Sequence, residues 1–182
     1  MKKLLEERIK IPQDVSCEVE GKKLICRKGP VELSKVLSSP KISLSIDQGS
    51  VLIKCEKSSK SEKKIVHSFI KHIESLFQGL NEKYIYTLEA CNVHFPMSIK
   101  IEPGKLMISN FLGEKIPRIA RILPNVDVSL RGQIITVTSA DRESAGQTAG
   151  NIETATKVKS RDRRVFQDGI YITKKPGDKK HD

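Results

Sequence analysis

Aromatic residues are scarce in this sequence. Tryptophan is absent, and phenylalanine, tyrosine and tryptophan together make up 4% of the 182 residues. Proteins that read single-stranded RNA by its sequence usually stack the bases on exposed aromatic side chains. The aromatic RNP1 motif of RRM domains is missing, and so is the GXXG loop of KH domains. These absences argue against the common single-strand readers.

Motifs of enzyme and metal chemistry are missing too. The sequence has no GxSxG, HExxH or GxxxxGK[ST] motif. His67 and His72 are five residues apart, so they do not share a helix face as a metal-binding pair would. The cysteines form no CxxC pair, and we interpret all four as small buried residues: Cys17, Cys26, Cys55 and Cys91. We therefore predict no enzyme activity, no cofactor, no metal and no small-molecule substrate.

Long hydrophobic runs are also absent. None reaches the roughly 18–20 residues that are needed to cross a bilayer. Glu6 and Glu7 interrupt the apolar start of the chain, which is unlike the hydrophobic region of a signal peptide. We expect a cytoplasmic protein.

Positive charge is what the sequence has in excess. Its 33 lysines and arginines against 22 acidic residues give a net charge of +11. A field of this sign attracts polyanions and raises the rate of encounter with them. Nucleic acid and an acidic membrane surface are the two natural partners of such a chain.

Two halves of the sequence repeat the same order of patterns. Residues 15–27 and 97–109 each alternate apolar and polar residues around a glycine-containing turn, as a β-hairpin does. Residues 42–55 and 126–138 form a second pair of predicted hairpins, with turns at Gly49 and Gly132. Helical patterns follow at residues 61–77 and 144–158, with Ser61 and Ser144 as the expected N-caps.

The two predicted helices differ in the side chains that they bury. The first has a bulky stripe formed by Ile65, Phe69, Ile73, Leu76 and Phe77, and the second has a smaller one formed by Ala145, Ala149, Ile152 and Thr156. The second helix also contains Gly146 and Gly150, each of which costs about 1 kcal/mol relative to alanine. Such glycines indicate close packing, either on the helix's own sheet or against a partner.

These patterns predict an α+β fold of two tandem duplicated domains, each an antiparallel-rich β-sheet covered by one helix. We place the first repeat, with an N-terminal extension, at residues 1–82. The second repeat spans residues 83–173, and a basic tail follows at residues 174–182.

Basic residues are densest near the C-terminus, around one short predicted strand. Because the planar guanidinium of arginine suits pairs of phosphate oxygens, we predict an RNA-binding site here. A solvated charged face is the alternative. The predicted RNA-binding residues are Lys157, Lys159, Arg161, Arg163, Arg164, Lys174, Lys175, Lys179, Lys180, Arg118 and Arg121.

The same stretch contains a predicted turn and two aromatic residues. Asp168 and Gly169 are expected to form a turn that aims the arginines, with a positive φ at Gly169 and a bond from Asp168 to nearby backbone. Phe166 and Tyr171 could stack on bases, but strand alternation places both more naturally against the sheet.

The stretch VKSRDRRVFQDGIYITKK resembles the C-terminal signature of the ribosomal protein L six family, of the archaeal and eukaryal type. The residues that carry the resemblance are Val158, Arg161, Arg164, Phe166, Asp168, Gly169, Tyr171 and Lys175. Thr154 departs from the pattern, because the family usually has Gln at this position. The length of the chain and its duplicated halves extend the resemblance to the whole sequence.

The resemblance implies a structural constituent of the large ribosomal subunit, without catalytic activity or a membrane partner. It implies binding to large-subunit ribosomal RNA, chiefly through the second repeat, beside the sarcin–ricin stem. It also implies neighbouring ribosomal proteins at the stalk base and elongation factors that dock nearby. An RNA-binding protein outside the ribosome, and an enzyme acting on an anionic substrate, are the two rival hypotheses.

Overall fold

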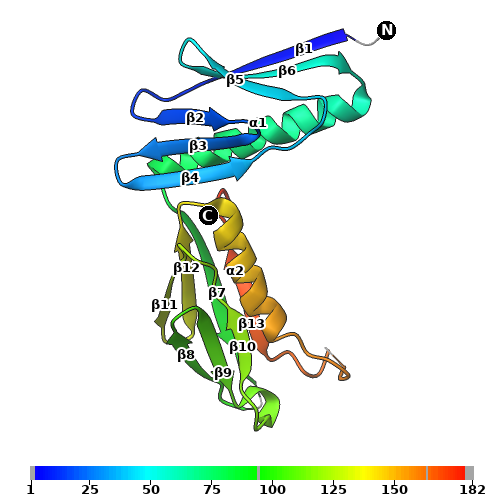
Figure 1. Cartoon of the computed structure of the whole chain (residues 1–182). Coiled ribbons are helices and arrows are strands. Elements are labelled where there is room, and N and C mark those ends of the chain that lie inside the picture. The colour runs from blue at the N-terminus through cyan, green and yellow to red at the C-terminus, as the bar shows by residue number, and fades with distance from the viewer. Residues whose placement is uncertain (1–2, 94, 163, 179–182) are drawn as a thin grey trace. The chain divides into compact units, whose positions relative to one another are not determined.

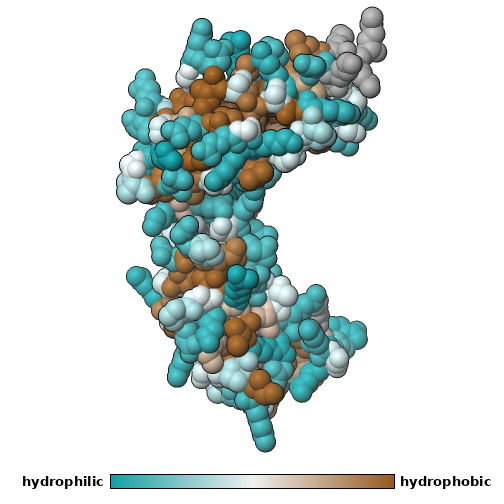
Figure 2. Space-filling view, in the orientation of Figure 1, coloured by the Kyte–Doolittle hydropathy of each residue, from teal (hydrophilic) through white to brown (hydrophobic). Residues whose placement is uncertain are grey.

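The protein consists of two compact units, Met1–Glu82 and Lys83–Asp182 (Figure 1). The computed structural model describes residues 3–93, 95–162 and 164–178. Hydrophilic side chains cover most of the visible face of each unit, and hydrophobic residues gather in smaller groups (Figure 2). Among the described residues, no helix has the length and apolar character that a membrane span requires.

The first unit combines two three-stranded antiparallel sheets with one helix (Figure 1). The sheet with strand order β1-β6-β5 contains β1 (Lys3–Lys10), β6 (Ser50–Ser58) and β5 (Ser43–Asp47). The sheet with strand order β2-β3-β4 contains β2 (Ser16–Glu20), β3 (Lys23–Lys28) and β4 (Val31–Val36). Helix α1 (Lys60–Asn81) packs against both sheets and closes one hydrophobic core.

Helix α1 begins earlier than its sequence pattern predicted. Its N-cap is Ser59 rather than Ser61, because Ser59 and Glu62 form a capping box that satisfies free backbone N–H groups at the first turn. Val66 is buried in the core, whereas Ile65 is 37% exposed and does not belong to the stripe. The other predicted members of the stripe are buried, so the helix shows its expected amphipathic character.

The second unit has the same arrangement with one extra strand. One sheet has strand order β10-β9-β8, formed by β8 (Ser98–Glu102), β9 (Lys105–Ser109) and β10 (Arg118–Arg121). A short 3-10 helix, η1 (Phe111–Gly113), connects β9 to β10. The other sheet has strand order β11-β12-β7-β13, formed by β7 (Tyr84–Cys91), β11 (Asp127–Arg131), β12 (Ile134–Ser139) and β13 (Gly169–Lys174). Helix α2 (Arg142–Ala155) covers the core.

The strand orders confirm the predicted α+β fold of two duplicated domains. In each unit the first strand pairs with the last strand before the helix, as β1 pairs with β6 and β7 with β12. All four predicted hairpins form, and Gly49 and Gly132 have the positive φ angles of 71° and 61° that their turns require. The predicted order of two hairpins and a helix did not include β1, β4, β7 and β10, each of which pairs with the edge of a predicted hairpin, whereas β13 corresponds to the short strand predicted among the basic residues.

Helix α2 also begins earlier than predicted. Its N-cap is Asp141 rather than Ser144, because the Asp141 carboxylate accepts hydrogen bonds from the backbone N–H groups of Glu143 and Ser144. The predicted small-residue stripe is buried as expected. A Cβ atom at Gly146 would lie 3.0 Å from the hydroxyl of Tyr86 on β7, so this glycine allows the helix to approach its own sheet.

Candidate nucleic-acid interface

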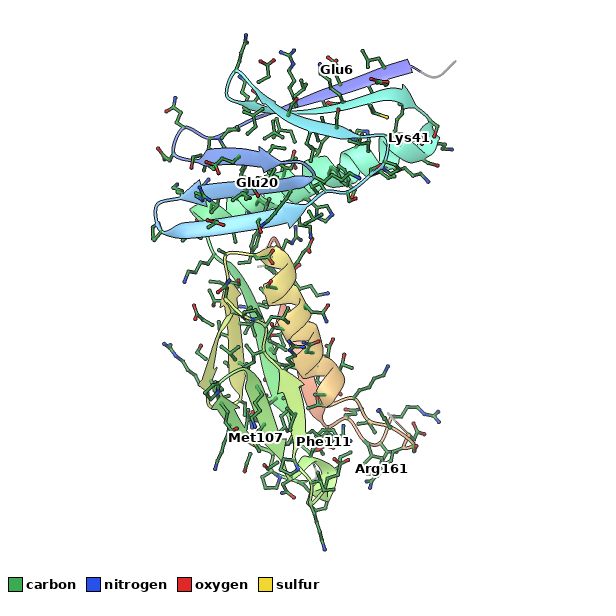
Figure 3. The ribbon with its side chains drawn as sticks, viewed as in Figure 1. Glu6, Glu20, Lys41, Met107, Phe111 and Arg161 are labelled. Carbon is green, nitrogen blue, oxygen red and sulfur yellow. The ribbon has the colours of Figure 1, made fainter. Side chains whose placement is uncertain are left out.

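The densest group of basic side chains lies on the segment between α2 and β13, residues 157–168, here called the basic loop. In Figure 3 this loop extends from the end of α2 with the labelled Arg161 upon it. The described basic side chains of the loop are all exposed: Lys157, Lys159, Arg161 and Arg164. The structure therefore brings together four of the predicted RNA-binding residues. Arg163 lies outside the described residues.

Buried residues fix both ends of the basic loop. Val158 is 9% exposed and packs in the core of the second unit, and Asp168 is completely buried. Just before the loop, Thr156 Oγ1 accepts a hydrogen bond of 2.9 Å from the backbone N–H of Ile170 on β13. The exposed cations are thus attached to a rigid frame, which lowers the entropy that is lost when they bind a ligand.

Two of the loop's arginines are held by neighbours within the loop. The guanidinium of Arg161 stacks on the Phe166 ring at 4.8 Å from its centroid. Arg164 donates from Nη2 to Asp162 Oδ2 at 2.9 Å, while its side chain stays 90% exposed. This hydrogen bond lowers the pKa of Asp162. Asp162 therefore orients Arg164 rather than merely diluting the positive charge.

The predicted turn at Asp168 and Gly169 is wrong. Gly169 is the first residue of β13, and its φ is not among the positive angles of the described chain. This glycine leaves room for an aromatic ring, because a Cβ atom there would lie 2.9 Å from the Tyr171 ring and hydroxyl and would displace them. Asp168 does bond to backbone, as predicted, but to the distant Val93 N–H at 2.8 Å. The pair therefore docks β13 beside β7.

Arg118, one of the predicted RNA-binding residues, has an internal role in the structure. Its guanidinium forms a bidentate pair with Glu114, at 2.8 and 2.6 Å, and lies 4.2 Å from the centroid of the Phe111 ring. It also donates to the carbonyl oxygens of Ala155 and Lys157, at 3.0 and 3.1 Å. We reassign Arg118 as the residue that attaches β10 to the end of α2. Its hydrogen bond also lowers the pKa of Glu114.

The remaining predicted cations lie outside the basic loop. Arg121 is exposed at the end of β10. Lys174 and Lys175 are exposed at the far end of β13, five residues and hence about 17 Å from Gly169. Lys179 and Lys180 lie outside the described residues. The structure thus separates the basic loop from the C-terminal lysines, which the sequence had suggested were one site.

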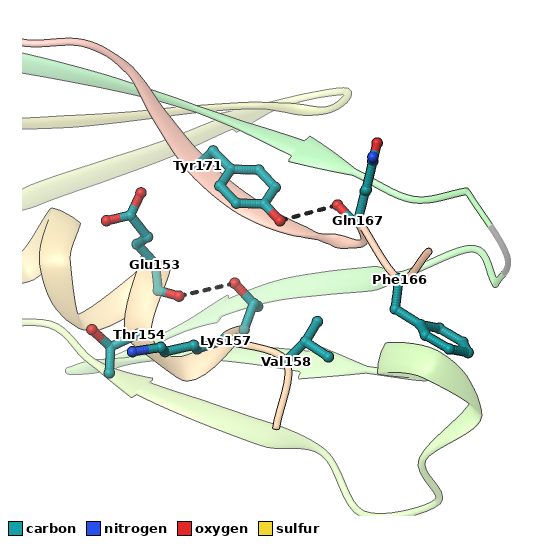
Figure 4. Close-up of a pocket in the computed structure, with 8 residues that line it drawn as sticks. Glu153, Thr154, Lys157, Val158, Phe166, Gln167 and Tyr171 are labelled. Atoms are coloured by element: carbon teal, nitrogen blue, oxygen red, sulfur yellow. Dashed lines mark hydrogen bonds between the residues drawn. The ribbon is translucent and has the colours of Figure 1, made fainter. Parts of the chain in front are cut away.

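A cavity of about 340 Å³ lies beside the basic loop, between the end of α2 and the start of β13 (Figure 4). Its lining includes Glu153, Thr154, Lys157, Phe166, Gln167 and Tyr171. The Tyr171 ring lies over Gly169 at the start of β13 and is 43% exposed, and Phe166 packs partly against the core, so both rings lie against the sheet as predicted. The sequence signal for the contact between Gly169 and Tyr171 was their spacing: they are two residues apart, so strand alternation puts them on one face of β13.

The described residues contain no group of His, Cys, Asp and Glu side chains that is arranged to hold a metal ion. Cys17 and Cys26 face each other across β2 and β3, with their sulfur atoms 3.0 Å apart, and both are free thiols. Their hydrogen bond lowers the pKa of Cys17 and raises that of Cys26. Cys26 and Cys55 are buried as predicted, whereas Cys17 is partly exposed and Cys91 is exposed.

Comparison with known proteins connects this geometry to a family. Residues 95–169 match the family model described as ribosomal protein L6. The chain is 38% identical to large ribosomal subunit protein uL6 of Methanococcus vannielii, over 96% of both chains. It is 40% identical to uL6 of Archaeoglobus fulgidus, over 94% of this chain and 90% of the relative. It is 39% identical to uL6 of Methanosarcina mazei, over 96% of this chain and 99% of the relative.

Proposed function

The chain belongs to the ribosomal protein L6 family, and from this premise we propose that its basic loop binds large-subunit ribosomal RNA. Membership of this family makes the protein a structural constituent of the large ribosomal subunit rather than an enzyme. The finer proposal is that the second unit contacts the RNA beside the sarcin–ricin stem, where elongation factors dock. Ribosomal proteins at the stalk base are its proposed neighbours.

One observation carries the proposal. Lys157, Lys159, Arg161 and Arg164 are exposed on a loop whose two ends are buried in the core. Folded RNA presents closely spaced phosphates, and arginine can bind two phosphate oxygens with its planar guanidinium. A loop that is fixed at both ends and carries several such groups suits recognition of RNA shape and backbone better than readout of a flexible strand.

The remaining predicted cations have secondary places in this proposal. Arg121, Lys174 and Lys175 are exposed on the same unit but outside the basic loop, so they would contact other phosphates. Arg163, Lys179 and Lys180 are retained as RNA-binding residues from the sequence alone. Arg118 acts through the position of α2 and not through RNA, because its donors are already engaged inside the protein.

Assembly of the large subunit tests this proposal. We expect simultaneous substitution of Arg161, Arg163 and Arg164 by Ser to reduce incorporation of the protein into large subunits at least tenfold, since charge-assisted hydrogen bonds contribute about 1.5–3 kcal/mol each. The measurement is the amount of tagged protein that sediments with large subunits when it competes with the wild type.

The matched control removes the same charge from the first unit. Lys60, Lys63 and Lys64 are exposed on the first turns of α1, and their substitution by Ser should leave incorporation within twofold of the wild type. Thermal unfolding of both variants establishes that they fold. Equal incorporation of the two folded variants would show that the basic loop is only a solvated face.

A further inference from the structure

The cavity beside the basic loop has a half-exposed aromatic wall that the fold holds in one orientation (Figure 4). The Tyr171 ring lies over Gly169, where any larger residue would collide with it. The Tyr171 hydroxyl donates a hydrogen bond of 3.0 Å to the carbonyl oxygen of Gln167. An aromatic ring that is fixed at its edge and its tip, yet 43% exposed, is prepared to stack on a planar ligand.

Glu153 supplies a carboxylate to the same cavity. Its Oε1 accepts a hydrogen bond of 3.3 Å from the backbone N–H of Ile172, which places the carboxylate next to Tyr171 (Figure 4). Each carboxylate oxygen has two lone pairs, so both oxygens retain the capacity to accept from a ligand. The side chain of Lys157 also lines the cavity, and its positive charge offsets that of Glu153.

A carboxylate on a surface that binds phosphates is unfavourable unless the ligand brings hydrogen-bond donors to it. The Watson–Crick edge of guanine carries two adjacent donors, the N1–H and N2–H₂ groups, and these match the two oxygens of a carboxylate. The other RNA bases lack such a pair of adjacent donors. A volume of about 340 Å³ is in the lower part of the range of pockets for small ligands, roughly 300–1,000 Å³, and suits one nucleotide.

We propose that this cavity binds a single unpaired guanine of the RNA, with its base against Tyr171 and its Watson–Crick edge on Glu153. The inference rests on the proposed RNA binding by the basic loop. It adds a base-specific contact to a surface that otherwise recognises the RNA backbone. Lys157, at the mouth of the basic loop, would hold a phosphate of the same nucleotide or its neighbour.

Kethoxal provides a direct test, because this reagent modifies unpaired guanines at N1 and N2. The full chain would be bound to large-subunit ribosomal RNA, and modified guanines would be mapped with wild-type protein, Glu153→Gln, Tyr171→Leu and Lys64→Gln. Wild type and Lys64→Gln should protect the same guanine. With Glu153→Gln, protection of that guanine should be at least tenfold weaker than with the wild type, because a bidentate base contact gives about tenfold to hundredfold discrimination. Its amide oxygen can still accept from Ile172, so the fold is preserved.

Two readouts keep this inference separate from the proposed function. Overall RNA affinity, measured by filter binding, reports on the basic loop, and kethoxal protection reports on the cavity. If wild-type protein binds the RNA but protects no guanine in a way that depends on both Glu153 and Tyr171, the guanine site is overturned and the proposed function stands. If wild-type protein does not bind the RNA, the proposed function fails first.

Discussion

Gly169 and Tyr171 show how one residue can be required for the position of another. The expectation of a left-handed glycine in a turn came from the Asp-Gly dipeptide, which is a common turn signal. In the structure this glycine is instead the first residue of a strand, and the space above it is filled by an aromatic ring. The dipeptide alone does not distinguish the two roles, whereas the spacing of Gly169 and Tyr171 on one strand face does.

A double-mutant cycle tests this relation. Gly169→Ala should lower the free energy of unfolding by about 1–3 kcal/mol, because the new methyl group displaces the Tyr171 ring. In a Tyr171→Ser background the same substitution should change that free energy by less than about 0.5 kcal/mol. Urea denaturation of the four proteins measures both effects. Equal losses in the two backgrounds would mean that Gly169 is needed for its backbone and not for the ring.

Gly146 and Gly150 answer the question that the sequence left open for α2. Gly146 faces Tyr86 at close range, so it serves packing on the helix's own sheet. A Cβ atom at Gly150 would meet no atom within 4 Å, so internal packing gives no reason for this glycine. Sequence alone cannot separate the two, because the difference depends on which strand lies beneath the helix.

Helix α1 depends on one buried carboxylate at its first turn. Glu62 accepts a hydrogen bond of 2.7 Å from Lys41 Nζ and one of 2.9 Å from the backbone N–H of Ser59. The bonds from Lys41 and Ser59 lower the pKa of Glu62 to about 2. An ordinary glutamate has a pKa of about 4.3 in the unfolded chain. The charged form of Glu62 therefore stabilises the fold at neutral pH.

The pH dependence of stability tests this contribution. Because the pKa of Glu62 is lower in the folded state, its stabilisation is complete above about pH 5 and disappears as the pH falls through about 4 towards about 2. Glu62→Gln should be less stable than the wild type at pH 7, and the difference should shrink between pH 5 and pH 3. Urea denaturation at a series of pH values measures it. A difference that stays constant down to pH 3 would contradict this origin.

The hairpins were predictable from sequence, whereas their assembly into sheets was not. Alternation around glycine turns is local, so the pairs β2–β3, β5–β6, β8–β9 and β11–β12 could be recognised. Strand β7 lies between β12 and β13, and its partners are separated from it by tens of residues. The observed helix starts differ from the predicted ones by two or three residues. Several residues near each start can act as N-cap, and the local backbone geometry decides which of them does so.

Comparison of the two duplicated units shows which part of the second unit carries the candidate site. Both units share the pairing of their first strand with the strand before the helix, but the second unit continues into the basic loop and β13. Strand β13 adds to the edge of β7, a position for which the sheet of the first unit, β5-β6-β1, has no counterpart. The proposed RNA-binding residues of the loop therefore lie on a segment by which the described parts of the two units differ.

The sequence predicted the basic residues of this segment but not the way they are distributed in space. Lys174 and Lys175 are close to the loop along the chain, yet the intervening strand separates them in space. Arg118 is a cation in the second half, yet its partners are inside the unit. Charge can be counted along a chain, whereas the direction of each side chain depends on long-range packing.

The salt dependence of RNA binding tests the central claim most directly. The measurement compares log Kd against log salt for large-subunit ribosomal RNA with the wild type and two triple variants. We predict that substitution of Lys157, Arg161 and Arg164 by Gln reduces the slope by about 2–3, since each phosphate contact contributes about 0.7–0.9. Substitution of Lys60, Lys63 and Lys64 by Gln should leave the slope unchanged. Equal slopes for the wild type and the basic-loop variant would contradict binding of RNA phosphates by this loop.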